Sequence, residues 1–172
     1  MDINKYCEIL DSSSEKVLQL ARSCSSKQLG FKPEGKWGIL EILEHIWLTD
    51  KIIHYLISKP TDKVSQSSEI IGDTKLKRFV ADGRTKKIEA PDVVKPKGNL
   101  PDIETFEELF LKHRERLKKD LKTGQIVVDN RMIKHFYMGE MTISDWLNLI
   151  VHHTHRHLKQ INEVITDMEE RT

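Results

Sequence analysis

The chain has 172 residues, of which 38% are hydrophobic and 32% charged, a composition typical of a helix-rich globular domain with a substantial core. The formal net charge of +1 provides no strong field toward nucleic acid or a membrane surface, and we expect neither as a partner. No apolar run approaches the roughly 20 residues of a membrane span, and the amino-terminal residues lack the apolar core of a signal peptide, so we expect a cytoplasmic protein. Cys7 and Cys24 form no metal-ligand pattern and are expected to be reduced structural thiols.

Four long helices are predicted from apolar residues that recur every three or four positions. Their predicted ranges are residues 3–23, 39–58, 103–122 and 143–168. The last helix is expected to begin with a capping box, in which Thr142 and Asp145 each accept a hydrogen bond from the other's backbone. Before it, we expect residues 125–130 to be extended and residues 135–141 to form a turn.

Residues 61–101 are the least periodic part of the chain and contain three prolines and three glycines. We expect mainly loop with one short helix near residues 75–80, and a loop of this length inside a domain is usually functional or disordered. Segment 75–97 holds eight basic and three acidic residues, but without a recognition motif a solvated basic loop is the favoured interpretation. Residues 1–172 are therefore predicted to form one all-α domain, a four-helix bundle with a long irregular crossover between the second and third long helices.

Histidine is concentrated in the last helix, where residues 152–157 hold four of the eight histidines of the chain. Successive helical residues turn by about 100°, so residues that are four apart share a face. His153 and His157 therefore lie on the apolar face of this helix, whereas His152 lies at its flank and His155 nearly opposite. An i, i+4 pair of this kind can place two imidazole nitrogens on one metal ion.

His45 is the possible third member of a histidine cluster, because it shares the apolar face of the second long helix with Ile42 and Ile52. Three neutral imidazoles would suit Zn²⁺ or Ni²⁺ and would leave a coordination position open. The alternative is a core network without metal, in which side chains or water satisfy the ring nitrogens. The sequence alone leaves both alternatives open, since it does not show whether the histidines lie at one depth.

Three other residues are candidates for catalytic roles. His113 continues the apolar stripe of the third long helix and could be a fourth ligand, a general base, or a core histidine at another level. His135 precedes the turn and could contact substrate or cover one end of the bundle. Glu41 lies one helical turn before His45 and could orient its ring, or be an ordinary exposed acid. Asp50 lies off the His45 face and is expected at the surface.

Three sequence segments resemble the DinB/YfiT-like family of four-helix bundles. KWGILEILEHIWLTD is similar to the family's pattern of Trp followed by Glu-x-x-x-His, and HFYMGEMTISDWL is similar to its His-Pro-x-x-Gly turn. HHTHRHLKQI is similar to its His-x-x-x-His followed by a Gln-Ile pair. The chain departs from the family at Phe136, where a proline is usual, and at Gly38, which replaces a common helix-capping serine.

The resemblance implies an up-down-down-up bundle, often a homodimer, with a divalent metal on three histidines. Carried over to this chain, the ligands are His45, His153 and His157, the same three residues that the helical projection favours. The family includes proposed metal-dependent hydrolases and thiol S-transferases, as well as many members without a demonstrated activity.

Two functions follow as hypotheses. The first is a metal-dependent enzyme whose open coordination position takes water, as in a hydrolase, or the thiolate of a low-molecular-weight thiol, with a small molecule as substrate. The alternative is a non-catalytic bundle that binds metal or a partner, such as a stress-response accessory protein. An enzyme needs a further acid, base or hydrogen-bond donor near the metal, so the positions of His113, His135 and Glu41 should discriminate between them.

Overall fold

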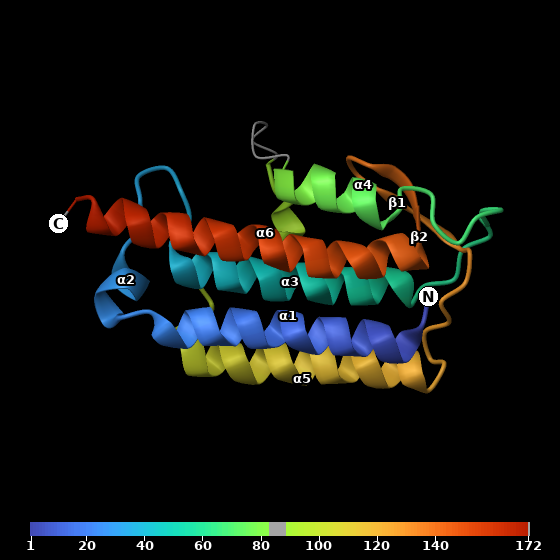
Figure 1. The fold of residues 1–172 in the computed structure, drawn as a ribbon, viewed down its shortest axis with the longest axis horizontal. Coiled ribbons are helices and arrows are strands. Elements are labelled where there is room, and N and C mark those ends of the chain that lie inside the picture. Colours follow the sequence, from blue (N-terminus) through green and yellow to red (C-terminus); the bar gives the residue numbers. More distant parts are fainter. Residues whose placement is uncertain (83–88, 172) are drawn as a thin grey trace.

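The structure, a computed structural model, describes residues 1–82 and 89–171. Its four long helices are α1 (Ile3–Ser23), α3 (Ile39–Ile57), α5 (Ile103–Lys122) and α6 (Ile143–Glu169). They lie side by side along the longest axis, with α1 and α6 running in one direction and α3 and α5 in the other (Figure 1). This up-down-down-up bundle confirms the predicted fold. No helix of the described residues is long and apolar enough to cross a membrane.

A short helix and a two-stranded hairpin were not predicted from the sequence. A one-turn helix, α2 (Ser26–Gly30), follows α1 and begins with a capping box. Strands β1 (Met132–His135) and β2 (Gly139–Thr142) pair as an antiparallel hairpin immediately before α6. The expected turn is therefore the tip of a hairpin, and the extended chain lies later than residues 125–130. Gly139 adopts a φ of 78°, which favours glycine at this turn.

The crossover between α3 and α5 is more structured than a loop. It contains α4 (Asp73–Lys77), a π-helical turn (Arg78–Asp82) and a 3₁₀ turn (Asp92–Val94). The short helix expected near residues 75–80 is thus present. α4 packs against α6, and the 3₁₀ turn packs against α3, so the crossover covers two of the four long helices (Figure 1).

Two carboxylates hold the crossover at its two ends. Asp145, in the first turn of α6, accepts hydrogen bonds from the backbone N–H groups of Ile70, Ile71 and Gly72 at 2.9–3.2 Å. Burial opposes ionisation of Asp145, but these backbone donors outweigh it and lower its pKa. Glu44, on α3, is buried and accepts from three successive backbone N–H groups at the other end of the crossover, those of residues 97–99.

A polar layer crosses the middle of the bundle, between two apolar clusters of the core. At its centre is Arg114 of α5, which is 1% exposed. Its guanidinium donates to Asp50 on α3 at 2.8 Å, to Thr154 on α6 at 2.8 Å and to Ser14 on α1 at 3.0 Å. Each long helix therefore contributes at least one residue to the layer, and α1 also contributes Ser13, which accepts from Arg114 at 3.4 Å.

The prediction that Asp50 lies at the surface is wrong. Asp50 is fully buried, because its face of α3 packs against α5. A carboxylate in that position needs a cation and hydrogen bonds, and Arg114 supplies the positive charge and a hydrogen bond to Oδ2. The helical projection placed Asp50 away from His45 but could not show that the second face is also covered.

Candidate metal centre

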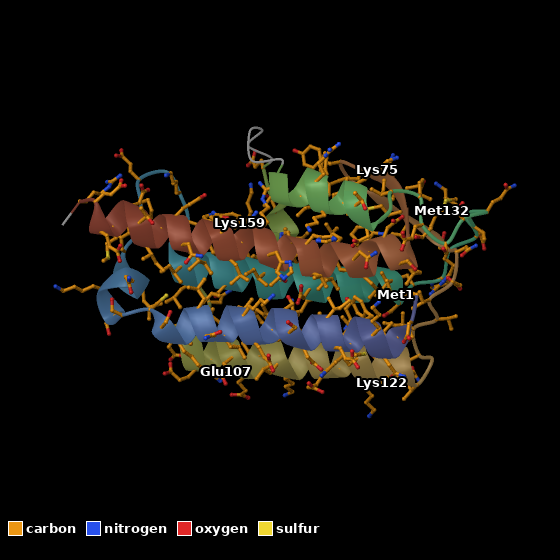
Figure 2. The ribbon with its side chains drawn as sticks, viewed as in Figure 1. Met1, Lys75, Glu107, Lys122, Met132 and Lys159 are labelled. Carbon is orange, nitrogen blue, oxygen red and sulfur yellow. The ribbon has the colours of Figure 1, made fainter. Side chains whose placement is uncertain are left out.

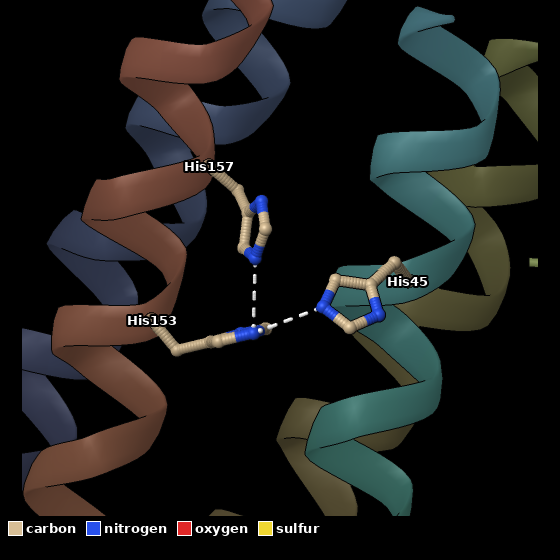
Figure 3. Close-up of side chains that lie close together, drawn as sticks. All are labelled: His45, His153 and His157. Carbon is tan, nitrogen blue, oxygen red and sulfur yellow. Dashed lines mark hydrogen bonds between the residues drawn. The ribbon is translucent and has the colours of Figure 1, made fainter. Parts of the chain in front are cut away.

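Three histidines from two helices converge on one point (Figure 3). His45 comes from α3, and His153 and His157 come from successive turns of α6. The Nε2 atom of His153 lies 3.1 Å from that of His45 and 3.0 Å from that of His157. Among the described residues, these three are the group of histidine, cysteine or acidic side chains whose potential ligand atoms all lie within 4.8 Å of one another.

The second ring nitrogen fixes the tautomer of two of these histidines. His45 Nδ1 donates to the backbone carbonyl of Val94 at 2.7 Å, and His157 Nδ1 donates to the side-chain oxygen of Gln160 at 2.7 Å. Both acceptors are oxygens without hydrogen, so each Nδ1 carries the ring hydrogen. In the neutral rings, the Nε2 atoms of His45 and His157 therefore present lone pairs to the cluster.

Counting hydrogens shows why a cation fits this cluster. Burial is the largest cause that lowers the pKa of all three histidines, that of His157 to about 3, so the rings are neutral near pH 7. His153 Nε2 faces two lone pairs and can donate at most one hydrogen, which leaves one close nitrogen pair without a hydrogen bond. A divalent ion would accept all three lone pairs, and tetrahedral coordination at Zn–N distances of about 2.0–2.1 Å places ligand nitrogens about 3.3 Å apart.

A cavity of about 1260 Å³ opens beside the three-histidine cluster. All three histidines line this cavity, so a metal held by them would be accessible rather than occluded. Much of the remaining wall is apolar and comes from the connector before α3, from α3 and α6, and from the crossover and the hairpin turn. Its apolar residues include Trp37, Ile53, Leu56, Val80, Phe136, Trp146 and Leu149. The arrangement suits a substrate with a substantial apolar part.

His135 is the predicted catalytic residue that the structure places in the same cavity. Its Nδ1 accepts hydrogen bonds from the backbone N–H groups of Tyr137 and Met138 at 3.1 and 3.2 Å. These two donors place the ring hydrogen on Nε2, for which no described residue is an acceptor. Burial lowers the pKa of His135 to about 4, so the ring is neutral near pH 7 and can donate from Nε2.

His113 and Glu41 lie away from the three-histidine cluster. The ring of His113 faces His54, with ring centroids 5.1 Å apart, and it does not line the large cavity. Glu41 binds Lys32 at 2.7 Å and accepts from the backbone N–H of Gly38 at 2.9 Å, which caps α3 in place of the missing serine. Glu41 therefore caps the helix. The group that orients the ring of His45 is the backbone carbonyl of Val94.

His152, expected at the flank of the apolar face, is covered by another element. It is buried, and its Nε2 lies 2.7 Å from a carboxylate oxygen of Asp73 in α4. The crossover covers this side of α6 and converts a flank residue into a contact between helices. His155, expected on the opposite side, is half-buried.

The residues that orient His45 and His157 were not among those predicted from the sequence. Val94 carried no signal, because a backbone carbonyl in an aperiodic crossover has no residue-specific pattern. Gln160 did carry one, since it lies three residues after His157 on the same helix and a side-chain amide oxygen is a common acceptor for a ligating histidine.

Comparison with known proteins shows the family and the fold of this chain. The sequence model of the DinB superfamily matches residues 9–161. The chain belongs to the DinB superfamily. The uncharacterised protein YuaE of Bacillus subtilis (strain 168) is 24% identical over 155 residues, which cover 86% of this chain and 90% of YuaE.

Two solved structures share the fold of this DinB-superfamily chain. TT2238, a four-helix bundle protein, matches with a TM-score of 0.60 at 18% identity over 94% of this chain and 99% of its own. YfiT from Bacillus subtilis, described as a probable metal-dependent hydrolase with an unusual four-helix bundle topology, matches with a TM-score of 0.59 at 20% identity. That match covers 97% of this chain and 87% of YfiT.

Proposed function

We propose that this protein is a metal-dependent enzyme that acts on a small molecule with an apolar part. The observation that carries the proposal is the three-histidine cluster with too few hydrogens for its close contacts, in the wall of an open cavity. The likeness to YfiT supports a hydrolase-type activity. Structural zinc sites are usually closed by four protein ligands, whereas three histidines leave a position for chemistry.

Each residue has a distinct role in this proposal. His45, His153 and His157 hold the ion, and Val94 and Gln160 keep two of these rings in the orientation that presents Nε2. When bound, Zn²⁺ or Ni²⁺ supplies a Lewis acid that lowers the pKa of a water or thiol in its open position and so makes a nucleophile available at neutral pH.

His135 acts in this proposal as a hydrogen-bond donor and not as a general base. Two backbone N–H groups occupy its Nδ1, so only Nε2–H is available to a substrate oxygen in the cavity. The same site serves hydrolysis or transfer to a low-molecular-weight thiol, depending on which nucleophile enters. The thiol as a substrate and a homodimeric assembly are parts of the proposal that rest on the family resemblance.

Metal content tests this proposal most directly. We would measure it by mass spectrometry on untagged protein, beside His153→Ala/His157→Ala and the control His152→Ala/His155→Ala, which removes two histidines of α6 outside the cluster. We expect about one ion per chain in the wild type and the control, and loss of the ion in the first variant. A wild-type protein without metal, even after addition of Zn²⁺ or Ni²⁺ and dialysis, would overturn the proposal.

Activity assays then separate the two reactions. Metal-loaded protein would be assayed for hydrolysis of apolar esters and for conjugation of biological thiols to monochlorobimane. Thiol transfer predicts metal-dependent consumption of both thiol and monochlorobimane, whereas a hydrolase accelerates only the ester reaction. If the metal-loaded protein accelerates neither, the cluster serves binding alone.

A further inference from the structure

A second, smaller cavity of about 320 Å³ is lined by basic and imidazole side chains. Lys16 comes from α1, Lys77 from α4, and His152, His155 and Lys159 from α6. Figure 2 shows Lys159 on α6 beside the end of α4. We call this cavity the basic groove, and none of its lining residues lines the large cavity beside the three-histidine cluster.

The lining of the basic groove contains three lysines and no acidic residue. Lys16, Lys77 and Lys159 are all exposed, and none forms an ion pair with another described residue. Asp73 lies next to the groove lining, and its carboxylate is bound to His152. The chain has 28 basic and 27 acidic residues, so an acid-free lining does not follow from an overall excess of positive charge.

Packing between α4 and α6 brings Lys77 and Lys159, from two different helices, to the same groove. His152 binds Asp73 at the start of α4, and the guanidinium of Arg156 donates to the carbonyl of Val80 just after α4 at 3.2 Å. Lys77 lies between these two attachment points, so its position relative to Lys159 is fixed by helices rather than by a free loop. A site held in this way loses less conformational freedom on binding than separate surface lysines would.

We propose that the basic groove binds a small oxyanion of the phosphate type, either free or as part of a small phosphorylated molecule. Three ammonium groups and an imidazole supply N–H donors and positive charge, whereas the volume admits a compact group rather than a macromolecular segment. This site is independent of the metal proposed for the three-histidine cluster, because the two cavities share no lining residue.

Phosphate titration tests the proposal. Binding of inorganic phosphate would be followed by calorimetry at low ionic strength for wild type, for Lys77→Gln/Lys159→Gln, and for the control Lys75→Gln/Lys112→Gln. The control removes two exposed lysines from α4 and α5 outside the groove, so both variants change the net charge equally. We expect the groove variant to raise Kd at least about 10-fold and the control to raise it less than about 2-fold.

Two results would overturn the phosphate site. One is equal weakening in both variants, which would show that only net charge matters, and the other is the absence of saturable binding to wild type. The His153→Ala/His157→Ala protein should bind phosphate as wild type does. Loss of binding there would instead place the phosphate at the metal centre.

Discussion

At the scale of single residues, His113 shows what burial does to a histidine that has no metal to bind. Its Nε2 is buried and has no hydrogen-bond partner among the described residues. Burial, followed by the neighbouring His54, lowers its pKa to about 4, from an ordinary value of about 6.5. The folded state therefore binds a proton at His113 less readily than the unfolded state, and the stability that the neutral ring allows is lost as pH falls from about 6.5 to about 4.

The loss of stability at low pH that is due to His113 can be tested in the metal-free protein. The free energy of unfolding of the wild type should fall when the pH is lowered from 7 to 5. In His113→Leu this fall should be smaller by about 1–2 kcal/mol, because one source of proton uptake on unfolding is removed. Urea unfolding at the two pH values measures the difference. Lys112→Leu, one position earlier on α5, is the control and should retain the wild-type dependence; a wild-type dependence in His113→Leu would contradict the assignment.

At the scale of elements, the crossover contributes to the candidate metal centre. The carbonyl of Val94 orients His45, and the next few residues, 97–99, are held by the carboxylate of Glu44, the residue before His45. Asp145 holds the other end of the crossover, at residues 70–72, and has no contact with a ligand-orienting residue of the cluster. The two anchors resemble each other chemically, but only one of them is next to the site.

Exchanging each carboxylate for its amide separates the two anchors. Both Glu44→Gln and Asp145→Asn should speed hydrogen exchange of the backbone amides they hold, because an amide group replaces one accepting oxygen. Only Glu44→Gln should weaken metal binding, by about 10-fold, which is typical of losing support for a ligating histidine. Metal titration of both variants measures this, and equal affinities would show that the crossover does not position His45.

At the scale of the whole molecule, a bound ion would join α3 to α6, two long helices that are separated in sequence by the crossover and α5. The apolar core lies on both sides of the polar layer and does not depend on the ion. We therefore expect the metal-free protein to be folded and the metal to add stability by binding only the folded state.

Removing the metal should lower Tm without unfolding the protein at room temperature. At a free ion concentration 1,000 times Kd, binding contributes about 4 kcal/mol, which corresponds to a rise in Tm of about 8–16 °C for a chain of this size. Thermal unfolding with added Zn²⁺ and with a chelator measures the shift. His153→Ala/His157→Ala should show no shift, and a shift of the wild-type size in that variant would place the stabilising ion elsewhere.

Periodicity predicted the long helices and the inward faces of His45, His153 and His157, because both depend on local geometry. Periodicity did not predict which residues are buried where another element covers a second face of a helix. Asp50 and His152 lie on such faces, against α5 and α4 respectively, and no local pattern shows which elements pack there. Val94 and the hairpin turn around His135 approach the cluster only through tertiary structure, so their contacts could not be read from the sequence.

The polar layer around Arg114 also has a consequence for helix register. A slip of α3 or α6 by one turn, about 5.4 Å, would break the bond of Arg114 to Asp50 or to Thr154 and leave a buried charge or donor unpaired. Apolar side chains alone tolerate such slips more easily, since they have no directional bonds. Because Thr154 directly follows His153, the bonds that align these helices also keep the histidines of α3 and α6 at one level.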